Sequence, residues 1–176
     1  DRAIQHCISS PIQRCVDTAA LMIEGADRTH KVVNTHTIEI VEQRLLVEPG
    51  SFVLDIQQAA PYFRKQGALG FINSFVNNAL PGMKHPITGV FDVLELLYHT
   101  HPTQHNGLSL AVSHDTILAA IVAVISGQTQ IEQSDWPEMM EGLFVWFEGE
   151  DFSNSKLKWI WRGQKHELVI KDFQNK

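Results

Sequence analysis

The stretch GLSLAVSHDTILAAIVAVISG, residues 107–127, most constrains the fold of this chain. Its pattern predicts an apolar strand over 108–112, a polar Ser-His-Asp turn, and then a helix from about Thr116. The helix is apolar on almost every face, which is typical of a buried helix. A strand, a sharp turn and a buried helix form half of a β-α-β unit. The sequence therefore predicts an α/β fold with parallel strands.

A second strand-to-helix unit lies near the beginning, in ISSPIQRCVDTAALM at 8–22. A short strand is predicted over 4–8. Ser10 is then a suitable N-cap, Pro11 is a suitable first helical residue, and Gly25 is expected to end the helix.

The remaining elements follow from composition and periodicity. We expect a loop over 27–30, a strand within 37–47, helical structure over 55–79 that splits near Gly67, a helix over 88–98, and a terminal antiparallel hairpin formed by 143–149 and 156–163. The chain has no internal repeat and no shift in composition that would mark a linker. We therefore expect a single domain over 1–176.

The composition excludes several classes of partner. Hydrophobic residues make up 44% of the 176 residues and charged residues 19%, which is typical of a folded domain. The formal net charge of -6 gives no general attraction to nucleic acid or to an anionic membrane. No apolar run reaches the roughly 20 residues that span a bilayer. We expect no nucleic-acid partner and no membrane insertion.

Cysteines and histidines give no pattern of a metal site. Cys7 and Cys15 form neither a disulfide framework nor a metal-type spacing, so we expect small buried residues in a reducing compartment, the cytoplasm. His99, His101 and His105 lie close together, but no cysteine or nearby carboxylate completes a site. We expect a solvated loop there, no metal and no cofactor.

Polar residues follow both predicted strands at the point where the chain turns into a helix. Ser9, Ser10 and Arg14 lie beside the free N–H groups of a helix N-terminus, which favour an anion, and the arginine fork matches a phosphate or carboxylate. His114 and Asp115 follow the other strand, where ligands bind in such folds. Taken singly, Arg14 is typical of a surface charge and Asp115 of a helix cap. Together the two turns predict an anion site with a histidine and an acid.

Two segments resemble the histidine phosphatase superfamily, which has the phosphoglycerate-mutase-like fold. ISSPIQRCVDTA at 8–19 is similar to the family's Ser-Ser-Pro-Leu-x-Arg-Ala-x-x-Thr-Ala segment, and LAVSHDTILAAI at 110–121 is similar to its second catalytic histidine turn. The His-Asp-Thr sequence and the terminal WPEMMEGLFVWFEG and KLKWIWRGQKHEL segments resemble the acid phosphatase branch. The resemblance implies a three-layer α/β sandwich with a mixed, mostly parallel central sheet and a C-terminal β-hairpin.

The resemblance also implies a reaction, in which a phosphoryl group passes to a histidine and then to water. By this similarity Arg14 binds the phosphoryl oxygens, His114 stabilises the transferring group and Asp115 protonates the leaving alcohol. In the mutase-like branch the donor is a glutamate in the middle of the chain, a role that Glu48 or Glu42 could take. No metal is implied, because arginine and histidine supply the positive charge.

One part of the family pattern has no counterpart in the sequence. The family's nucleophile is the histidine of an Arg-His-Gly segment at the end of its first strand, and residues 1–176 contain no Arg-His-Gly. Either a strand and a helix precede Asp1, or the protein is a relative without the nucleophile. We favour a preceding segment, because loss of a central strand would expose apolar faces on both neighbours.

The hypothesis is a phosphomonoester hydrolase that acts through a phosphohistidine on a small phosphorylated substrate. One alternative is a non-catalytic relative that uses Arg14 and His114 to bind a phosphorylated ligand or protein. Another is a phosphoglycerate-mutase-like phosphotransferase. The terminal hairpin is a candidate homodimer interface.

Overall fold

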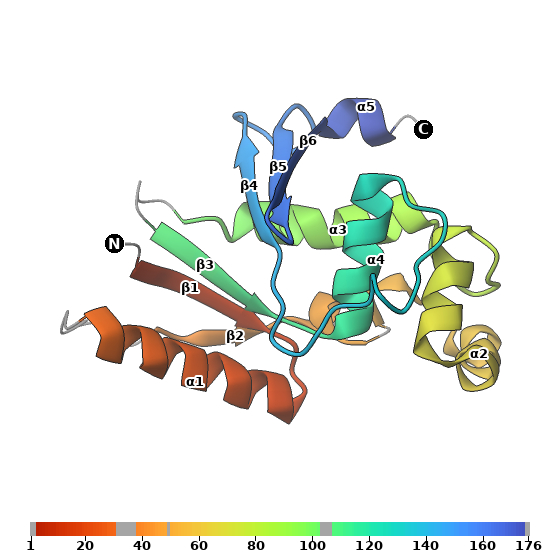
Figure 1. Cartoon of the computed structure of the whole chain (residues 1–176), viewed down its shortest axis with the longest axis horizontal. Helices are drawn as coiled ribbons and strands as arrows, with labels where there is room; N and C mark the ends of the chain where they lie inside the picture. The colour runs from red at the N-terminus through yellow and green to blue at the C-terminus, as the bar shows by residue number, and fades with distance from the viewer. Residues whose placement is uncertain (1–2, 31–37, 49, 103–106, 175–176) are drawn as a thin grey trace.

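Three parallel strands form the sheet on which both polar turns lie. The computed structural model describes residues 3–30, 38–48, 50–102 and 107–174. β1 (Ala3–Ser9), β2 (Ile40–Glu42) and β3 (Gly107–Val112) pair in the order β2-β1-β3, all parallel (Figure 1). The last residues of β1 and β3 lie opposite each other in register. The strands predicted over 4–8 and 108–112 are confirmed, and they end at the same edge of the sheet.

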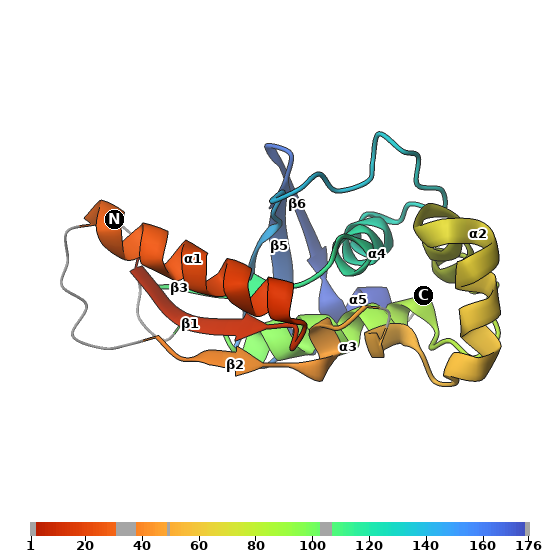
Figure 2. The ribbon, with the colours of Figure 1, turned by 90° about the horizontal axis from the view of Figure 1, so that it is seen from below.

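α1 (Gln13–His30) lies along one face of this sheet (Figure 2). The predicted boundaries of this helix are wrong at both ends. The helix begins at Gln13 rather than directly after Ser10, and it continues through Gly25, so that 27–30 are helical instead of forming a loop. A glycine costs a helix interior only about 1 kcal/mol, and the good helix formers on either side of Gly25 extend the helix across it.

α4 (Asp115–Ser126) confirms the predicted buried helix. Nine of its 12 residues are buried. The helix begins one residue earlier than expected, because His114 rather than Asp115 occupies the N-cap position. Gly127, with a φ of 70°, ends the helix in the left-handed conformation that glycine adopts without strain.

The chain between β2 and β3 is mainly helical. α2 (Ile56–Val76) is broken at Gly67, whose φ is 68°, and the predicted split near this residue is confirmed. α3 (Pro86–His99) confirms the helix predicted over 88–98. The strand predicted within 37–47 is short, because the chain leaves β2 for the 3-10 turns η1 (Arg44–Leu46) and η2 (Gly50–Phe52).

A second, antiparallel sheet follows α4. Its strands are β4 (Phe144–Glu148), β5 (Lys156–Trp161) and β6 (Gln164–Val169), paired in the order β4-β5-β6 and followed by α5 (Ile170–Gln174). The predicted hairpin is confirmed, and β6 was not predicted.

The predicted mostly parallel sheet and C-terminal hairpin are both present, but the described residues form no mixed sheet. There β3 pairs only with β1, and β4 pairs only with β5, so that parallel and antiparallel strands form two separate sheets (Figure 1). The chain is α/β, as predicted, with five α-helices among the described residues.

The hydrophobic core joins the helices to β5. Phe52 stacks on Phe75 with ring centroids 4.6 Å apart, and Leu157 and Trp159 of β5 belong to the same buried cluster as α3 and α4. Among the described residues, no helix combines the length and the apolar character needed to cross a membrane.

Candidate functional site

The ends of β1 and β3 bring the two predicted polar turns together. The backbone N–H of Ser10 donates to the carbonyl of Val112, with an N–O distance of 2.8 Å. Ser10 Oγ lies 3.0 Å from Nε2 of His114, and Arg14 Nη2 lies 3.0 Å from Nδ1 of the same ring. We call Ser10, Arg14, Glu48 and His114 the Arg14–His114 cluster.

The hydrogen bonds around His114 determine its charge. A guanidinium has only donors, so Arg14 donates and Nδ1 of His114 accepts. A ring nitrogen that accepts carries no proton, which leaves a neutral imidazole whose proton lies on Nε2, facing Ser10 Oγ. Burial and then the charge of Arg14 lower the pKa of His114 below its usual value, against the opposing effect of Asp115. The free site therefore holds a neutral histidine beside a permanent cation.

Glu48 is the carboxyl group that approaches this histidine. Its Oε2 lies 3.7 Å from Nδ1 of His114. Burial, followed by the negative charge of Asp115, raises the pKa of Glu48 above its usual value. A raised carboxyl pKa and a lowered imidazole pKa both favour uncharged forms. Glu48 is therefore suited to holding a proton next to a neutral imidazole.

A hydroxyl from the second turn holds the Glu48 segment against the sheet. Ser113, directly after β3, donates from Oγ to the carbonyl of Leu46 at 2.8 Å. Leu46 is buried and lies two residues before Glu48. This contact between segments 67 positions apart explains why Glu48 reaches the cluster.

In the described part of the chain, the side chains of the other predicted site residues form no hydrogen bond or ion pair with His114. The Ser9 hydroxyl is buried and donates to the carbonyl of Ser10 at 2.9 Å. Glu42 is exposed on β2, where it lies opposite Ser9 in register. Asp115 follows His114 directly, but its Oδ2 accepts a hydrogen bond from Trp136 Nε1 at 2.9 Å.

Two residues near the site were not predicted to contribute to it. Cys15 was predicted only as a buried residue, which is confirmed, but its Sγ also lies 3.8 Å from Nε2 of His114 and 3.6 Å from the carbonyl of Ser113. Burial raises the pKa of this thiol, so it stays protonated. Trp136 reaches Asp115 from a loop, and the sequence signal is a tryptophan that directly follows polar residues.

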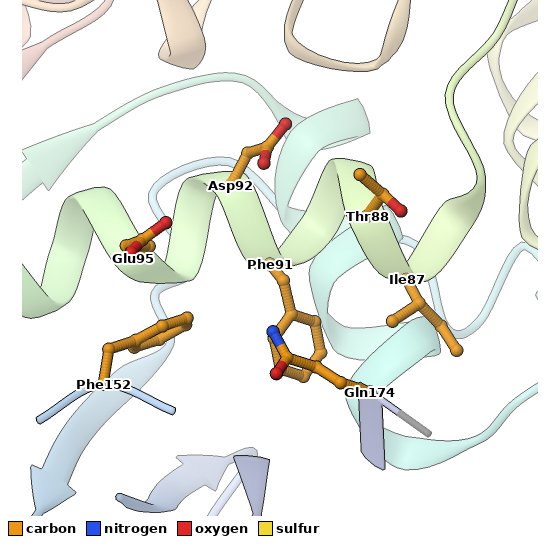
Figure 3. Close-up of a pocket in the computed structure, with 7 residues that line it drawn as sticks. All are labelled: Ile87, Thr88, Phe91, Asp92, Glu95, Phe152 and Gln174. Carbon is orange, nitrogen blue, oxygen red and sulfur yellow. The ribbon is translucent and has the colours of Figure 1, made fainter. Parts of the chain in front are cut away.

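A separate hollow of about 220 Å³ lies beside α3 and the end of the chain (Figure 3). Its walls include the carboxylates Asp92 and Glu95 and the rings of Phe91 and Phe152. Lys84 already pairs with Asp92 at 2.5 Å. Two carboxylates disfavour an anion, so this hollow does not compete with the Arg14–His114 cluster as a phosphate site.

No group of three or more His, Cys, Asp or Glu side chains within the described ranges is arranged to hold a metal ion. Of the histidines in the predicted solvated loop, His99 ends α3 and His101 follows it, whereas His105 lies outside the described residues.

Three comparisons with known proteins complete the description of the site. No family model, no curated protein and no solved structure matches this chain. The geometry of the Arg14–His114 cluster and the resemblance of its two motifs are therefore the grounds for a functional proposal.

Proposed function

We propose that the Arg14–His114 cluster binds the phosphoryl group of a phosphomonoester, and that the protein is a hydrolase of the histidine phosphatase type. The observation that carries this proposal is the 3.0 Å contact between the Arg14 guanidinium and the His114 ring. In this contact a permanent cation and a titratable imidazole lie side by side at the ends of two parallel strands, where ligands bind in α/β folds.

A phosphoryl group fits this cluster because it can change the charge of the histidine. Arg14 is exposed on the first turn of α1, so its remaining N–H groups are available to an incoming anion. When phosphate oxygens accept the hydrogen bonds of Arg14, Nδ1 of His114 loses its donor. The negative charge nearby then favours the imidazolium, which donates to the phosphoryl group.

The reaction we propose has two displacements. A histidine nitrogen attacks phosphorus, the phosphorus–oxygen bond of the ester breaks, and the alcohol leaves with a proton from a carboxylic acid. Water then attacks the phosphohistidine, breaks the phosphorus–nitrogen bond and returns a proton to that carboxylate. The resemblance implies Asp115 as the acid, and the raised pKa of Glu48 supports Glu48 as the alternative.

The attacking histidine is the part of this proposal that rests on the resemblance alone. Within the described ranges, only His114 among the histidines has contacts to Arg14, Ser10 and Glu48. Among the described residues β3 pairs on one side only, so a strand carrying a second histidine could pair with its other edge. If the protein has no such histidine, the same cluster would serve a non-catalytic protein that binds a phosphorylated ligand.

One experiment separates these functions. Hydrolysis of p-nitrophenyl phosphate and binding of inorganic phosphate by calorimetry are measured for the wild type, Arg14→Ala and His114→Ala, with the exposed α2 residue Arg64 changed to alanine as a control. We expect Arg14→Ala to lower kcat/KM on the order of 100-fold or more and to weaken phosphate binding. Phosphate binding without hydrolysis identifies a binding protein. Full activity in both site variants contradicts the proposal.

A further inference from the structure

The Asp115 carboxylate is held by a loop that lies far from it in the chain. Trp136 Nε1 donates to Asp115 Oδ2 at 2.9 Å, and the backbone N–H of Thr116 donates to Oδ1 at 2.8 Å. Both carboxylate oxygens are therefore engaged. Thr116 belongs to the same helix as Asp115, whereas Trp136 lies in the connection between α4 and β4. The direction of the carboxylate thus depends on where that connection runs.

Arg162, in the turn between β5 and β6, fastens this connection in place. Its Nε and Nη2 donate to the two carboxylate oxygens of Glu141 at 2.7 and 2.9 Å, which is a bidentate fork. Its Nη1 donates to the carbonyl of Ser134 at 2.6 Å, and Nη2 also donates to the carbonyl of Trp136 at 3.0 Å. One guanidinium thus holds both ends of the segment 134–141.

Two non-glycine residues near this guanidinium have backbone angles with a positive φ, which such residues rarely adopt. Arg162 and Gly163 form a two-residue hairpin turn, with φ of 47° at Arg162 and 78° at Gly163. Asparagine, aspartate or glycine is preferred at the first of these positions. Met140, directly before Glu141, also has a positive φ of 65°. Such conformations persist where surrounding contacts fix them, and here they lie at Arg162 and at the residue directly before its partner Glu141.

We propose that Trp136 is a positioning residue for Asp115, and that the Arg162–Glu141 pair is a latch that keeps Trp136 in place. The inference rests on the proposed function, because it concerns the acid next to the phosphate site. The chain of contacts runs from the β5–β6 turn to Glu141, through the loop to Trp136, and from its indole to Asp115. The β5–β6 turn of the antiparallel sheet therefore controls the orientation of the Asp115 carboxylate, which lies just after β3 of the parallel sheet.

The latch affects proton transfer whichever carboxyl group donates the proton. If Asp115 is the donor, the indole fixes its distance from the leaving oxygen. If Glu48 is the donor, the charge of Asp115 helps Glu48 to keep its proton, because that charge raises the pKa of Glu48. In both cases release of Asp115 harms esters with poor leaving groups more than esters with good ones, since only the former need a proton to leave.

The first test needs no catalytic activity. Exchange of the Trp136 indole N–H with solvent is followed by NMR in the wild type, Asp115→Ala and Arg162→Lys, and Trp136→Phe assigns the signal. We expect both variants to speed exchange on the order of 10-fold or more, because charge-assisted hydrogen bonds are lost. Trp159, which is 2% exposed and whose Nε1 has no partner among the described residues, is the internal control for folding.

The second test compares an alkyl phosphate with an aryl phosphate. In Trp136→Phe, which keeps an aromatic ring but removes the N–H, and in Arg162→Lys, we expect kcat for the alkyl ester to fall roughly 10-fold more than kcat for the aryl ester, with KM little changed. A merely structural role would lower both alike. If the variants speed indole exchange but the wild-type protein has no phosphatase activity, the latch is supported and the proposed function is contradicted. Unchanged exchange and unchanged leaving-group dependence in an active enzyme overturn the latch.

Discussion

His114 is neutral because Arg14 donates a hydrogen bond to it, so an anion that binds Arg14 also changes the charge of the histidine. An anion that takes over the hydrogen bonds of Arg14 frees Nδ1 and favours the imidazolium. The ring must then take up a proton, because its pKa is lowered in the free protein by burial and by Arg14.

We therefore predict that binding of sulfate, which does not titrate near neutral pH, is accompanied by proton uptake at pH 7. Calorimetry in buffers of different ionisation enthalpy measures this uptake. We expect up to about one proton per sulfate, and weaker binding as the pH rises. His114→Asn should bind without uptake. Uptake that persists in His114→Asn assigns the proton to another group and contradicts this account of the ring.

Glu48 gives a prediction for stability. Its pKa is raised in the folded protein, so the folded state keeps its proton at pH values where the unfolded chain, with the ordinary glutamate pKa of about 4.5, has lost it. Stability at this site is therefore fully present below pH 4.5 and falls as the pH rises through the folded pKa. We expect Glu48→Gln to raise the melting temperature at pH 7 relative to the wild type, but not at pH 4.

The control for this measurement is Glu42→Gln, because Glu42 is exposed on β2. Its change in melting temperature should be the same at both pH values. If Glu48→Gln also shifts the melting temperature equally at pH 4 and pH 7, the effect does not arise from ionisation of Glu48.

Single residues show where prediction from the sequence succeeds and where it ends. The proximity of Arg14 and His114 was predictable because each follows a strand whose pattern is clear, and parallel strands end together. The choice between Glu48 and Glu42 was not predictable, because it depends on a Ser113 hydrogen bond to a distant loop. The position of Trp136 was not predictable either, because it depends on a hydrogen bond from Arg162 in the distant β5–β6 turn.

Among the helices, the strongest apolar periodicities predicted correct helices, whereas single glycines predicted the end of a helix less well. α4 and α3 follow continuous apolar patterns that need a buried environment. α1 passes through Gly25 because glycine only weakens a helix, and the α2 split at Gly67 occurs because that residue adopts a positive φ. A glycine alone does not tell these two outcomes apart.

We predict opposite effects for alanine at two helical glycines. A Cβ at Gly89 of α3 would lie 2.8 Å from Cδ1 of Phe52, a buried ring that is stacked on Phe75. Gly89→Ala should therefore destabilise the fold by about 1–3 kcal/mol. Among the described side chains, a Cβ at Gly25 of α1 would meet nothing within 4 Å, so Gly25→Ala should stabilise by roughly 0.4–1 kcal/mol.

Denaturant unfolding of the two variants against the wild type measures both effects. Equal changes of the same sign would show that α3 can move away from Phe52 without loss, which contradicts the packing described for the core. Hydrolysis and phosphate binding should stay near wild-type values in Gly25→Ala.

For the whole molecule, the main difference from expectation is that the described parallel and antiparallel strands are not joined in a mixed sheet. The residues of β3 are only partly buried or exposed, whereas parallel strands are usually covered on both faces. β4 likewise exposes Phe144 and Trp146. Strand patterns in a sequence identify strands but not their neighbours, so the separation between β3 and β4 was not predictable.

The unpaired edge of β3 leads to a prediction about association. Among the described residues β3 pairs on one side only, and an open edge of a partly apolar strand is a template for pairing with another chain. We therefore expect a protein of residues 1–176 to self-associate with rising concentration in sedimentation velocity experiments. A charge on the edge strand should oppose this, so Ala111→Lys, at an exposed position of β3, should shift the equilibrium towards the monomer.

Ala20→Lys, at an exposed position of α1, adds the same charge away from the edge and should leave association unchanged. If both lysines reduce association equally, net charge rather than the β3 edge is responsible. If the wild type stays monomeric at all concentrations, the edge is not a pairing site.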